Sequence, residues 1–522
     1  FDILGLETLK TFEDTIERIL INEGNRKPTF EDIKAWYSAN LHPSVLDMKD
    51  QAVYKGVFHE GKYAGIFQFM NGGMQRLGQN AKVSSIEEIA TVSAIFRPGP
   101  LSAGVDKMYV KAKHGNEEVE YDHPLIEQVL GKTYGLIVFQ EQIMKLCSVV
   151  AGFPEEETDT VRRSIMKRKA SEAAESLAKA RAIKEQFVAG SVKNGVDKQL
   201  ADDLYEKILF FAGYGFNKSH AVCYAIDSYY CAWLLTYFEE EWLCAYLESM
   251  EGNPDKRAKA FSEVAALGYK IVPLDINEAQ KSWTILSGKR FMPSFMSCKG
   301  VGESAIDEIM ENRPYRDVKS MLWTDEGKWR HSKFNKKTME SLIRIRAFES
   351  MGIVGKEFES YKHMLNTMIP NWNSLRKSLK RNRWEGYDNF MRVSLINSGM
   401  PEFTKNEIIA NENDLFGYVS PDTIITEEQI RRLRDNDVRP IGEWDNEWMY
   451  WFVPTTVQEK RTRNGKNYLR MKVTSNDGNS EWMNCWGWDG KTKIHPYSIC
   501  VSIISEQEGW GKSCRWSKFK IM

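Results

Sequence analysis

The 522-residue sequence predicts an α+β multidomain protein in which helical domains precede a small C-terminal β-barrel. Apolar residues recur at spacings of three and four through most of the chain up to about residue 350, which is typical of amphipathic helices. The last hundred or so residues instead carry short strand-like runs separated by hairpin signals. A chain of this length has room for roughly three or four domains.

The composition excludes several classes of protein. Net charge is −1, with 71 basic and 72 acidic residues, so nucleic acid would be held by local basic patches and not by the whole surface. The most apolar stretch, AVCYAIDSYYCAWLLTYF, contains Asp227 and is expected to be a buried helix. The eight cysteines form no CxxC pair, which favours reduced structural thiols. No signal-peptide pattern is present, and we expect a cytoplasmic protein without a membrane partner.

Residues 11 to 130 are expected to be mixed helix and loop, with helical periodicity in TFEDTIERILI and SSIEEIATVSAIF. The second pattern stops at FRPGPL, where two prolines flank Gly99 and interrupt the helix. Arg97 is therefore expected on a rigid turn, where a structural role and a DNA-facing role are equally compatible with the sequence.

Residues from about 139 to 250 are strongly helical in pattern and should contain the largest core. Within this region, EEETDTVRRSIMKRK places acidic residues before basic ones, an order that suits any solvated helix. However, Arg162 and Arg163 are adjacent, and residues 163 and 167 lie one turn apart on the same face. This arrangement also suits a bound polyphosphate, with Lys167 as the third cation.

The stretch FAGYGFNKSHAVCYA is the most unusual in the chain. Asn217, Lys218, Ser219 and His220 stand together immediately before an apolar helix. An N-cap role explains Asn217 or Ser219, and a core histidine explains His220. Neither explanation covers all four side chains.

MSCKGVGESAIDEIM predicts a tight turn at Gly300-Val301-Gly302 that opens a helix, whose free N–H groups can bind phosphate. The pattern resembles a helix-hairpin-helix, a non-specific binder of the DNA backbone, and Lys299, Gly300 and Gly302 are its expected DNA contacts. A second unit is expected in FNKKTMESLIRIRAFESMG, where Arg346 replaces the usual turn glycine. Packing and phosphate binding are both open for that unit.

The end of the chain reads as β structure. MYWFVPTTVQEKRT, NYLRMKVTS and SEWMNCWGW are strand-like and are separated by the hairpin signals Asn464-Gly465 and Asp477-Gly478. Several short strands of this kind suggest a small barrel. Before them, the basic segment LRKSLKRNRW fits either a DNA-facing or a solvated helix.

These motifs occur in an order that resembles bacterial C-family replicative DNA polymerases, the family of the DNA polymerase III alpha subunit. FDILGLETL, FRPGPLSAG, VRRSIMKRK, GYGFNKSHAVCYA and YKIVPLDIN carry the resemblance, which is dense up to about residue 350. It implies a palm remnant (1–10), mostly helical fingers (11–252), a tandem helix-hairpin-helix module (253–354), a helical connector (355–410) and an OB-type barrel (411–522).

The resemblance implies template-directed DNA synthesis by two-metal catalysis. Asp2 then corresponds to one of three palm aspartates that hold two Mg²⁺ ions, because one carboxylate cannot hold both. No PDxDxDF stretch is present, so the other aspartates are expected on a partner chain with the palm, thumb and phosphoesterase-like domain. The chain is then the C-terminal part of a split polymerase, inactive without that partner. The alternative is a non-catalytic DNA-binding accessory protein derived from a polymerase.

The resemblance also assigns binding roles. Arg162, Arg163, Lys167 and residues 217–220 would hold the incoming dNTP. In the barrel, Arg461, Arg463 and Lys466 would contact the primer–template backbone. Trp451, Tyr468, Trp482 and Trp486 would either stack on single-stranded bases or fill the barrel core. NENDLFGYVS is either a helix before the barrel or, as a weaker alternative, a sliding-clamp-binding peptide.

Overall fold

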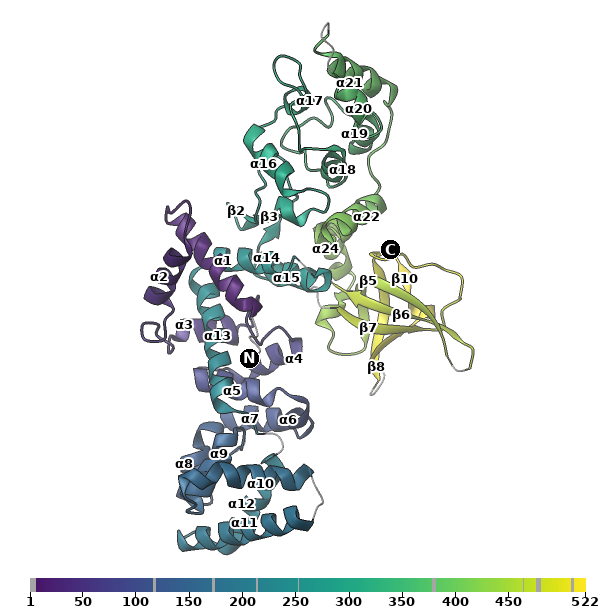
Figure 1. Cartoon of the computed structure of the whole chain (residues 1–522). Coiled ribbons are helices and arrows are strands. Elements are labelled where there is room, and N and C mark those ends of the chain that lie inside the picture. Colours follow the sequence, from purple (N-terminus) through teal and green to yellow (C-terminus); the bar gives the residue numbers. More distant parts are fainter. Residues whose placement is uncertain are drawn as a thin grey trace. The chain divides into compact units, whose positions relative to one another are not determined.

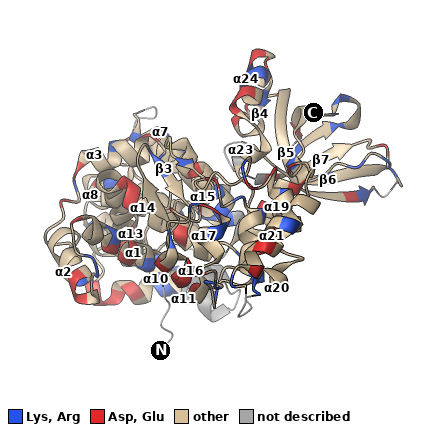
Figure 2. Ribbon diagram, turned by 90° about the horizontal axis from the view of Figure 1, so that it is seen from above, with Lys and Arg blue, Asp and Glu red and all other residues tan. Residues whose placement is uncertain are grey.

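The structure is a computed structural model that describes all residues except 1–5, 116–118, 171–173, 213–214, 252, 378–381, 463, 476–479 and 508–510. The chain forms two compact units, Phe1–Trp242 and Leu243–Met522. Most elements are helices, and a β-barrel ends the chain, which confirms the predicted fold class (Figure 1). Acidic and basic residues occur together on many elements (Figure 2). On α24 (Glu427–Asp435), Glu427 and Glu428 lie in the first turn and Arg432 and Arg434 in the last, an order that suits the helix dipole.

The first unit is helical. Its main helices are α1 (Glu7–Asn22), α2 (Phe30–Asn40), α4 (Gly72–Ala81), α5 (Ile86–Ile95), α6 (Pro98–Ser102), α7 (Val105–Lys113), α8 (Pro124–Leu130), α9 (Gln140–Lys145), α10 (Thr158–Ala170), α11 (Ala174–Lys193), α12 (Lys198–Ala212) and α13 (Lys218–Tyr237). The apolar stretch around Asp227 forms α13, as predicted, and buries Tyr229, Cys231 and Leu234. None of the helices described here is long and apolar enough to cross a membrane.

Helices α8 to α12 enclose one continuous core (Figure 1). Its centre consists of side chains that are almost completely buried, such as Ile143, Leu146, Phe187, Tyr205 and Ile208. These residues recur at helical spacing in the predicted stretches, which explains why this core could be recognised from the sequence. Only glycine fits at position 190, because a Cβ there would lie 1.9 Å from the carbonyl oxygen of Ala151.

The second unit begins with helices and a small sheet. The helices are α14 (Glu239–Ser249, which starts in the first unit), α15 (Pro254–Ala266), α16 (Glu303–Asn312), α17 (Val318–Leu322), α18 (Lys336–Arg344), α19 (Tyr361–Met368), α20 (Trp372–Leu375), α21 (Glu385–Ile396), α22 (Lys405–Phe416), α23 (Pro421–Ile424) and α24. Strands β1 (Lys270–Ile271), β2 (Thr284–Leu286) and β3 (Arg290–Met292) form a sheet in the order β1-β3-β2. The strand-like stretch GYKIVPLDIN contains β1, whereas no sequence pattern indicated β2 or β3.

The barrel contains five strands: β5 (Trp448–Arg461), β6 (Asn467–Thr474), β7 (Ser480–Trp486), β8 (Cys500–Gln507) and β9 (Gly511–Arg515). They pair in the order β8-β9-β7-β6-β5, and β8 also pairs with β5, which closes the barrel. The β7–β9 pair is parallel and the other four pairs are antiparallel. The short strands β4 (Arg439–Pro440) and β10 (Lys520–Ile521) extend the sheet. This is the predicted OB-type barrel.

One local expectation was wrong. The chain at FRPGPL does not form a simple turn, because Pro98 begins the short helix α6 and Arg97 is its N-cap residue. Proline is well tolerated at the first helical position, since the N–H that it lacks would have no partner there. The two prolines therefore end α5 and start a new helix.

Candidate functional site

The four polar residues before α13 occupy the start of that helix. The Oδ1 atom of Asn217 accepts hydrogen bonds from the backbone N–H of His220 at 2.9 Å and from the Ser219 hydroxyl at 2.8 Å. The backbone N–H of Lys218 donates to Glu141 Oε2 at 2.9 Å. Two carboxyl or amide side chains thus satisfy the first N–H groups of α13. The predicted N-cap role of Asn217 is confirmed.

A backbone pairing holds this helix start against the segment before α9. Phe139 and Phe216 form a parallel bridge, with Gln140 N–H donating to the Phe216 carbonyl at 2.9 Å. Gln142 Oε1 accepts the N–H groups of Val138 and Phe139 at 2.8 and 2.9 Å. The sequence interpretation missed Glu141 and Gln142. The signal was present in the polar QEQ that follows the apolar LIVF and opens a helix.

Three basic side chains converge on aromatic rings at this place. The guanidinium carbon of Arg97 lies 4.6 Å from the ring centroid of Phe216, and Lys218 Nζ lies 5.8 Å from that of Phe139. The His220 ring packs 4.0 Å from the Tyr224 ring, centroid to centroid. Burial lowers the pKa of Arg97. We call Arg97, Phe216, Lys218 and His220 the α13 cluster; the sequence did not place Arg97 beside the other three.

The other predicted cations of the first unit lie on α10. Arg162 and Arg163 share the carboxylate of Asp159, at 2.7 and 2.6 Å. These bonds, first of all the one from Arg162, lower the pKa of Asp159. The Arg163 side chain is 70% exposed, whereas that of Arg162 is 13% exposed, so the two differ in their freedom to meet a ligand. Lys167 lies on α10 as well, but its side chain is outside the described part of the structure.

The first helix-hairpin-helix unit has the predicted turn. Gly300 has φ +94°, and a Cβ there would lie 2.6 Å from the Ser341 hydroxyl, so this position favours glycine twice over. Gly302 is the N-cap of α16 and provides no side-chain cap, which leaves the first N–H groups of α16 for a ligand or water. The Lys299 side chain is 69% exposed, and its Nζ lies 3.6 Å from Oδ1 of Asp414.

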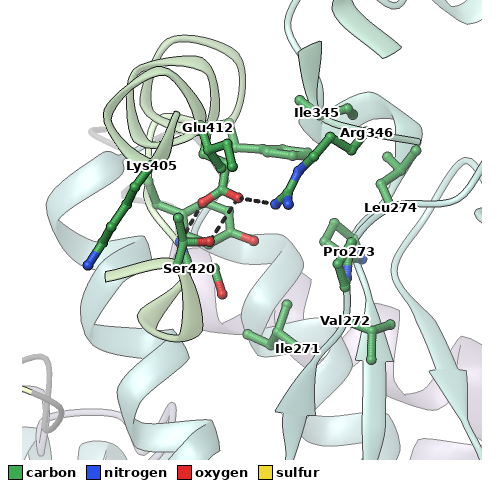
Figure 3. Close-up of a pocket in the computed structure, with 14 residues that line it drawn as sticks. Ile271, Val272, Pro273, Leu274, Ile345, Arg346, Lys405, Glu412 and Ser420 are labelled. Atoms are coloured by element: carbon green, nitrogen blue, oxygen red, sulfur yellow. Dashed lines mark hydrogen bonds and ion pairs between the residues drawn. The ribbon is translucent and has the colours of Figure 1, made fainter. Parts of the chain in front are cut away.

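The second unit differs from the first at Arg346. This residue has φ +61°, the left-handed conformation in which glycine is usual. Its guanidinium points into a pocket of about 380 Å³, where Nη2 lies 3.3 Å from Glu412 Oε1 (Figure 3). Ser420 N–H and the Thr423 hydroxyl donate to the same carboxylate, each at 3.0 Å. These contacts favour a packing role for Arg346.

The outer surface of β6 and β7 carries the aromatic residues that were considered for base stacking. Tyr468 and Trp486 are directly opposite, with ring centroids 4.7 Å apart. The Trp482 ring is 42% exposed and lies 4.9 Å from the guanidinium carbon of Arg470. Trp451, in contrast, is 1% exposed and packs with Leu433 and Val438 in a cluster outside the barrel core, so it neither fills that core nor is free to stack on a base. The sequence left these alternatives open, and the structure leaves three of the four aromatic residues, Tyr468, Trp482 and Trp486, at least partly exposed.

The predicted backbone contacts of the barrel lie at the β5–β6 connection. Arg461 ends β5 and donates from Nε to Asn467 Oδ1 at 3.2 Å. The exposed Lys466 donates its backbone N–H to the Thr462 hydroxyl. Arg463 lies outside the described residues. In OB-type barrels this loop borders the face of the second and third strands, here β6 and β7, where oligonucleotides bind.

The predicted metal ligand, Asp2, lies outside the described residues. Within the part of the chain that is described, no group of three or more His, Cys, Asp or Glu side chains is arranged to hold a metal ion. The two-metal prediction therefore concerns residues other than those placed here.

Comparison with known proteins agrees with this geometry. A profile of the bacterial DNA polymerase III alpha subunit finger domain matches residues 27–195, and a helix-hairpin-helix profile matches residues 268–357. The chain is 35% identical to the DNA polymerase III subunit alpha of Campylobacter jejuni over 362 residues, which is 68% of this chain and 28% of the relative. It is 31% identical to that of Aquifex aeolicus over 468 residues, which is 89% of this chain and 37% of the relative.

A match to a polymerase finger domain, a helix-hairpin-helix match and an OB-type barrel in one chain define the class of protein as one related to DNA polymerases. The chain belongs to the bacterial C-family of replicative DNA polymerases, whose matched members are DNA polymerase III alpha subunits. It spans about a third of the length of these relatives, from 28% to 37% in the two cited.

Proposed function

We propose that the chain takes part in template-directed DNA synthesis, in which a dNTP is transferred to the 3′-OH of a primer. The observation that carries this proposal is the match of finger and helix-hairpin-helix profiles to successive parts of the chain, followed by a closed OB-type barrel. Together these parts supply the contacts that a polymerase needs with the nucleotide, the duplex backbone and the single strand. The domain boundaries given above belong to the same proposal.

In the fingers, the dNTP is held by Arg162, Arg163, Lys167 and residues 217–220. The exposed guanidinium of Arg163 supports this role, because its bond to Asp159 can be exchanged for one to phosphate. The α13 cluster supports it too, since Arg97 and Lys218 place positive charge beside the rings of Phe216 and Phe139. Such groups would neutralise the charge that develops on the transferred phosphoryl group.

The DNA is held by the other two modules. Lys299, Gly300 and Gly302 bind the duplex backbone at the open start of α16. Arg461, Arg463, Lys466 and the outer face of β6 and β7 bind the single-stranded template. Leu415 and Phe416 of the DLF sequence are buried in α22, which supports its structural role over sliding-clamp binding.

Two Mg²⁺ ions would polarise the phosphate and lower the pKa of the primer hydroxyl. Asp2 is the proposed ligand from this chain. The other palm aspartates are proposed to come from a partner chain that bears the rest of the palm, the thumb and the phosphoesterase-like domain. A cytoplasmic location, in a bacterium or in the host of a virus, remains a prediction.

Nucleotide-dependent binding of DNA tests the finger assignment. We expect the chain to bind fluorescent primer–template DNA more tightly when the dNTP that matches the template is present with Mg²⁺, as measured by anisotropy. Arg163→Gln with Lys167→Gln should remove the dNTP effect and leave DNA binding without dNTP unchanged. The matched control is Arg181→Gln, an exposed arginine on neighbouring α11. DNA binding without any dNTP effect in the wild-type chain would favour the accessory-protein alternative.

A further inference from the structure

A polar pocket of about 510 Å³ lies on the barrel, beside the proposed DNA-binding face. It is lined by Glu447, Trp486, Ile503, Ser505, Ser513, Cys514, Arg515 and Lys518. This volume is in the range of about 300–1,000 Å³ that is usual for small-ligand sites. None of these residues except Trp486 was considered as a binding residue from the sequence.

Strand register connects the pocket to the aromatic face. Tyr468 on β6 is opposite Trp486 on β7, which in turn is opposite Arg515 on β9. Directly opposite residues in neighbouring strands point to the same side of a sheet. Tyr468, Trp486 and Arg515 therefore form one row across the outside of the barrel, and Trp486 belongs both to the ring pair and to the pocket wall.

The next row continues the polar surface. Asn484 on β7 is opposite Ser513 on β9, and Ser513 is opposite Ser505 on β8. The intervening residues Cys485, Ile504 and Cys514 belong to the barrel core. The alternation of core and outward positions places the hydroxyl groups of Ser505 and Ser513 side by side on the outward side of the sheet, where Ser505 is partly exposed and Ser513 is 7% exposed. Both hydroxyls can accept or donate hydrogen bonds.

The two basic residues of the pocket, Arg515 and Lys518, lie on ordered elements, and their side-chain charges can pair with a bound anion. Arg515 is exposed at the end of β9. Lys518 lies in a short helical turn, and its backbone carbonyl accepts a hydrogen bond from the Ser502 hydroxyl at 3.2 Å. The rings of Trp516 and Phe519, which flank this turn, stack with their centroids 5.1 Å apart. Among the described residues, neither Arg515 nor Lys518 forms an ion pair. Glu447 is the single carboxylate in the lining, so the pocket carries a net charge of +1.

We propose that this pocket binds one nucleotide of single-stranded DNA. The base stacks against Trp486 and receives hydrogen bonds from Ser505 and Ser513, while Glu447 accepts a hydrogen bond from its ring N–H or amino group. The adjoining phosphates contact Arg515 and Lys518. A row of aromatic rings that ends in a cationic polar pocket combines the stacking and backbone contacts by which proteins hold single strands. This inference rests on the proposed function, because it extends the DNA path from β6 and β7 onto β9 and β8.

The salt dependence of binding tests the inference. For single strands, log Kobs against log salt concentration has a slope of about −0.7 per neutralised phosphate. With fluorescent oligothymidylate and the intact chain, the double variant Arg515→Gln, Lys518→Gln should therefore make the slope less negative by about 1.4. The matched control, Lys491→Gln with Lys493→Gln, removes two exposed lysines that do not line the pocket and should leave the slope unchanged. Thermal unfolding verifies that each variant is folded.

Equal slope changes in the two double variants, or no change in either, would overturn the inference. Arg461→Gln with Lys466→Gln separates it from the proposed function. If that variant makes the slope less negative and the pocket variant does not, the barrel binds DNA but the nucleotide pocket is wrong. If the wild-type chain shows no salt-dependent binding, the DNA-binding role of the barrel and the pocket both fail.

Discussion

Single charged side chains in this chain are held by backbone groups as well as by opposite charges, and Glu308 is an example. Its carboxylate accepts the N–H groups of Ser332, Lys333 and Phe334 at 2.6, 2.8 and 2.6 Å. Partial burial opposes ionisation, but these bonds outweigh it, and the pKa of Glu308 is lowered. Ionised Glu308 thus joins α16 to the segment before α18.

Glu308→Gln should lower the free energy of unfolding at pH 7 by about 1–3 kcal/mol, because a charged acceptor of several hydrogen bonds is lost. A lowered folded-state pKa means that the wild-type stabilisation is present above the ordinary glutamate pKa of about 4.3 and is lost as pH falls toward the folded value. The difference between the two proteins in urea unfolding should therefore shrink in acid. The control is Glu311→Gln, an exposed residue of α16. A difference that grows in acid would contradict this assignment.

Residue roles could be predicted from sequence where the signal is local. Asn217 was recognisable as a cap because its partner, His220, is three residues away. Glu141 was missed because it caps a helix that starts 77 residues further along the chain. The left-handed conformation of Arg346 fits its place at a turn glycine of the motif, whereas its ion pair with Glu412 depends on tertiary contacts.

At the scale of elements, the turn before α16 depends on one glycine. Gly300→Ala should destabilise the chain by about 2–4 kcal/mol, since the left-handed backbone and the contact with Ser341 both oppose a Cβ. Gly302→Ala should cost at most about 1 kcal/mol, because the space around Gly302 is open and the change affects only the N-cap preference. Urea unfolding of both variants measures the difference, and equal costs would show that the turn conformation does not matter.

Two tryptophans of the barrel should have different roles, Trp482 in DNA binding and Trp451 in stability. Trp482→Ala should weaken single-stranded DNA binding by about 1–3 kcal/mol, the usual value of one stacked base, and change stability by no more than about 0.5 kcal/mol. Trp451→Ala should instead destabilise the barrel by about 3–5 kcal/mol, because the side chain is buried. Anisotropy and thermal unfolding report the two effects. Unchanged DNA affinity for Trp482→Ala would remove this ring from the DNA path.

The sequence predicted the elements whose pattern and turns are both local. Strand β6 alternates between buried and more exposed residues, and the sequences Asn-Gly and Asp-Gly, which are typical hairpin signals, stand between β5, β6 and β7. Strands β2 and β3 are three residues each, too short for alternation to be visible. The β5–β8 pairing that closes the barrel joins segments about fifty residues apart, and the alternation within a strand does not identify its partner.

At the scale of the whole molecule, the chain combines one helical unit that matches polymerase fingers with a second unit that carries two folds suited to DNA. This order of parts was the most predictable feature, because each family motif is a contiguous stretch of sequence. The catalytic centre was the least predictable, because two-metal catalysis brings together carboxylates from distant segments and the chain spans about a third of its relatives.

Primer extension tests the proposed function most directly. The chain alone should not extend a labelled primer on a template, whereas a mixture with a polymerase segment that bears the remaining palm aspartates should extend it in the presence of Mg²⁺ and dNTPs. Asp2→Ala in this mixture should abolish extension and leave primer–template binding unchanged. No extension by the wild-type mixture, or undiminished extension with Asp2→Ala, would contradict the proposal.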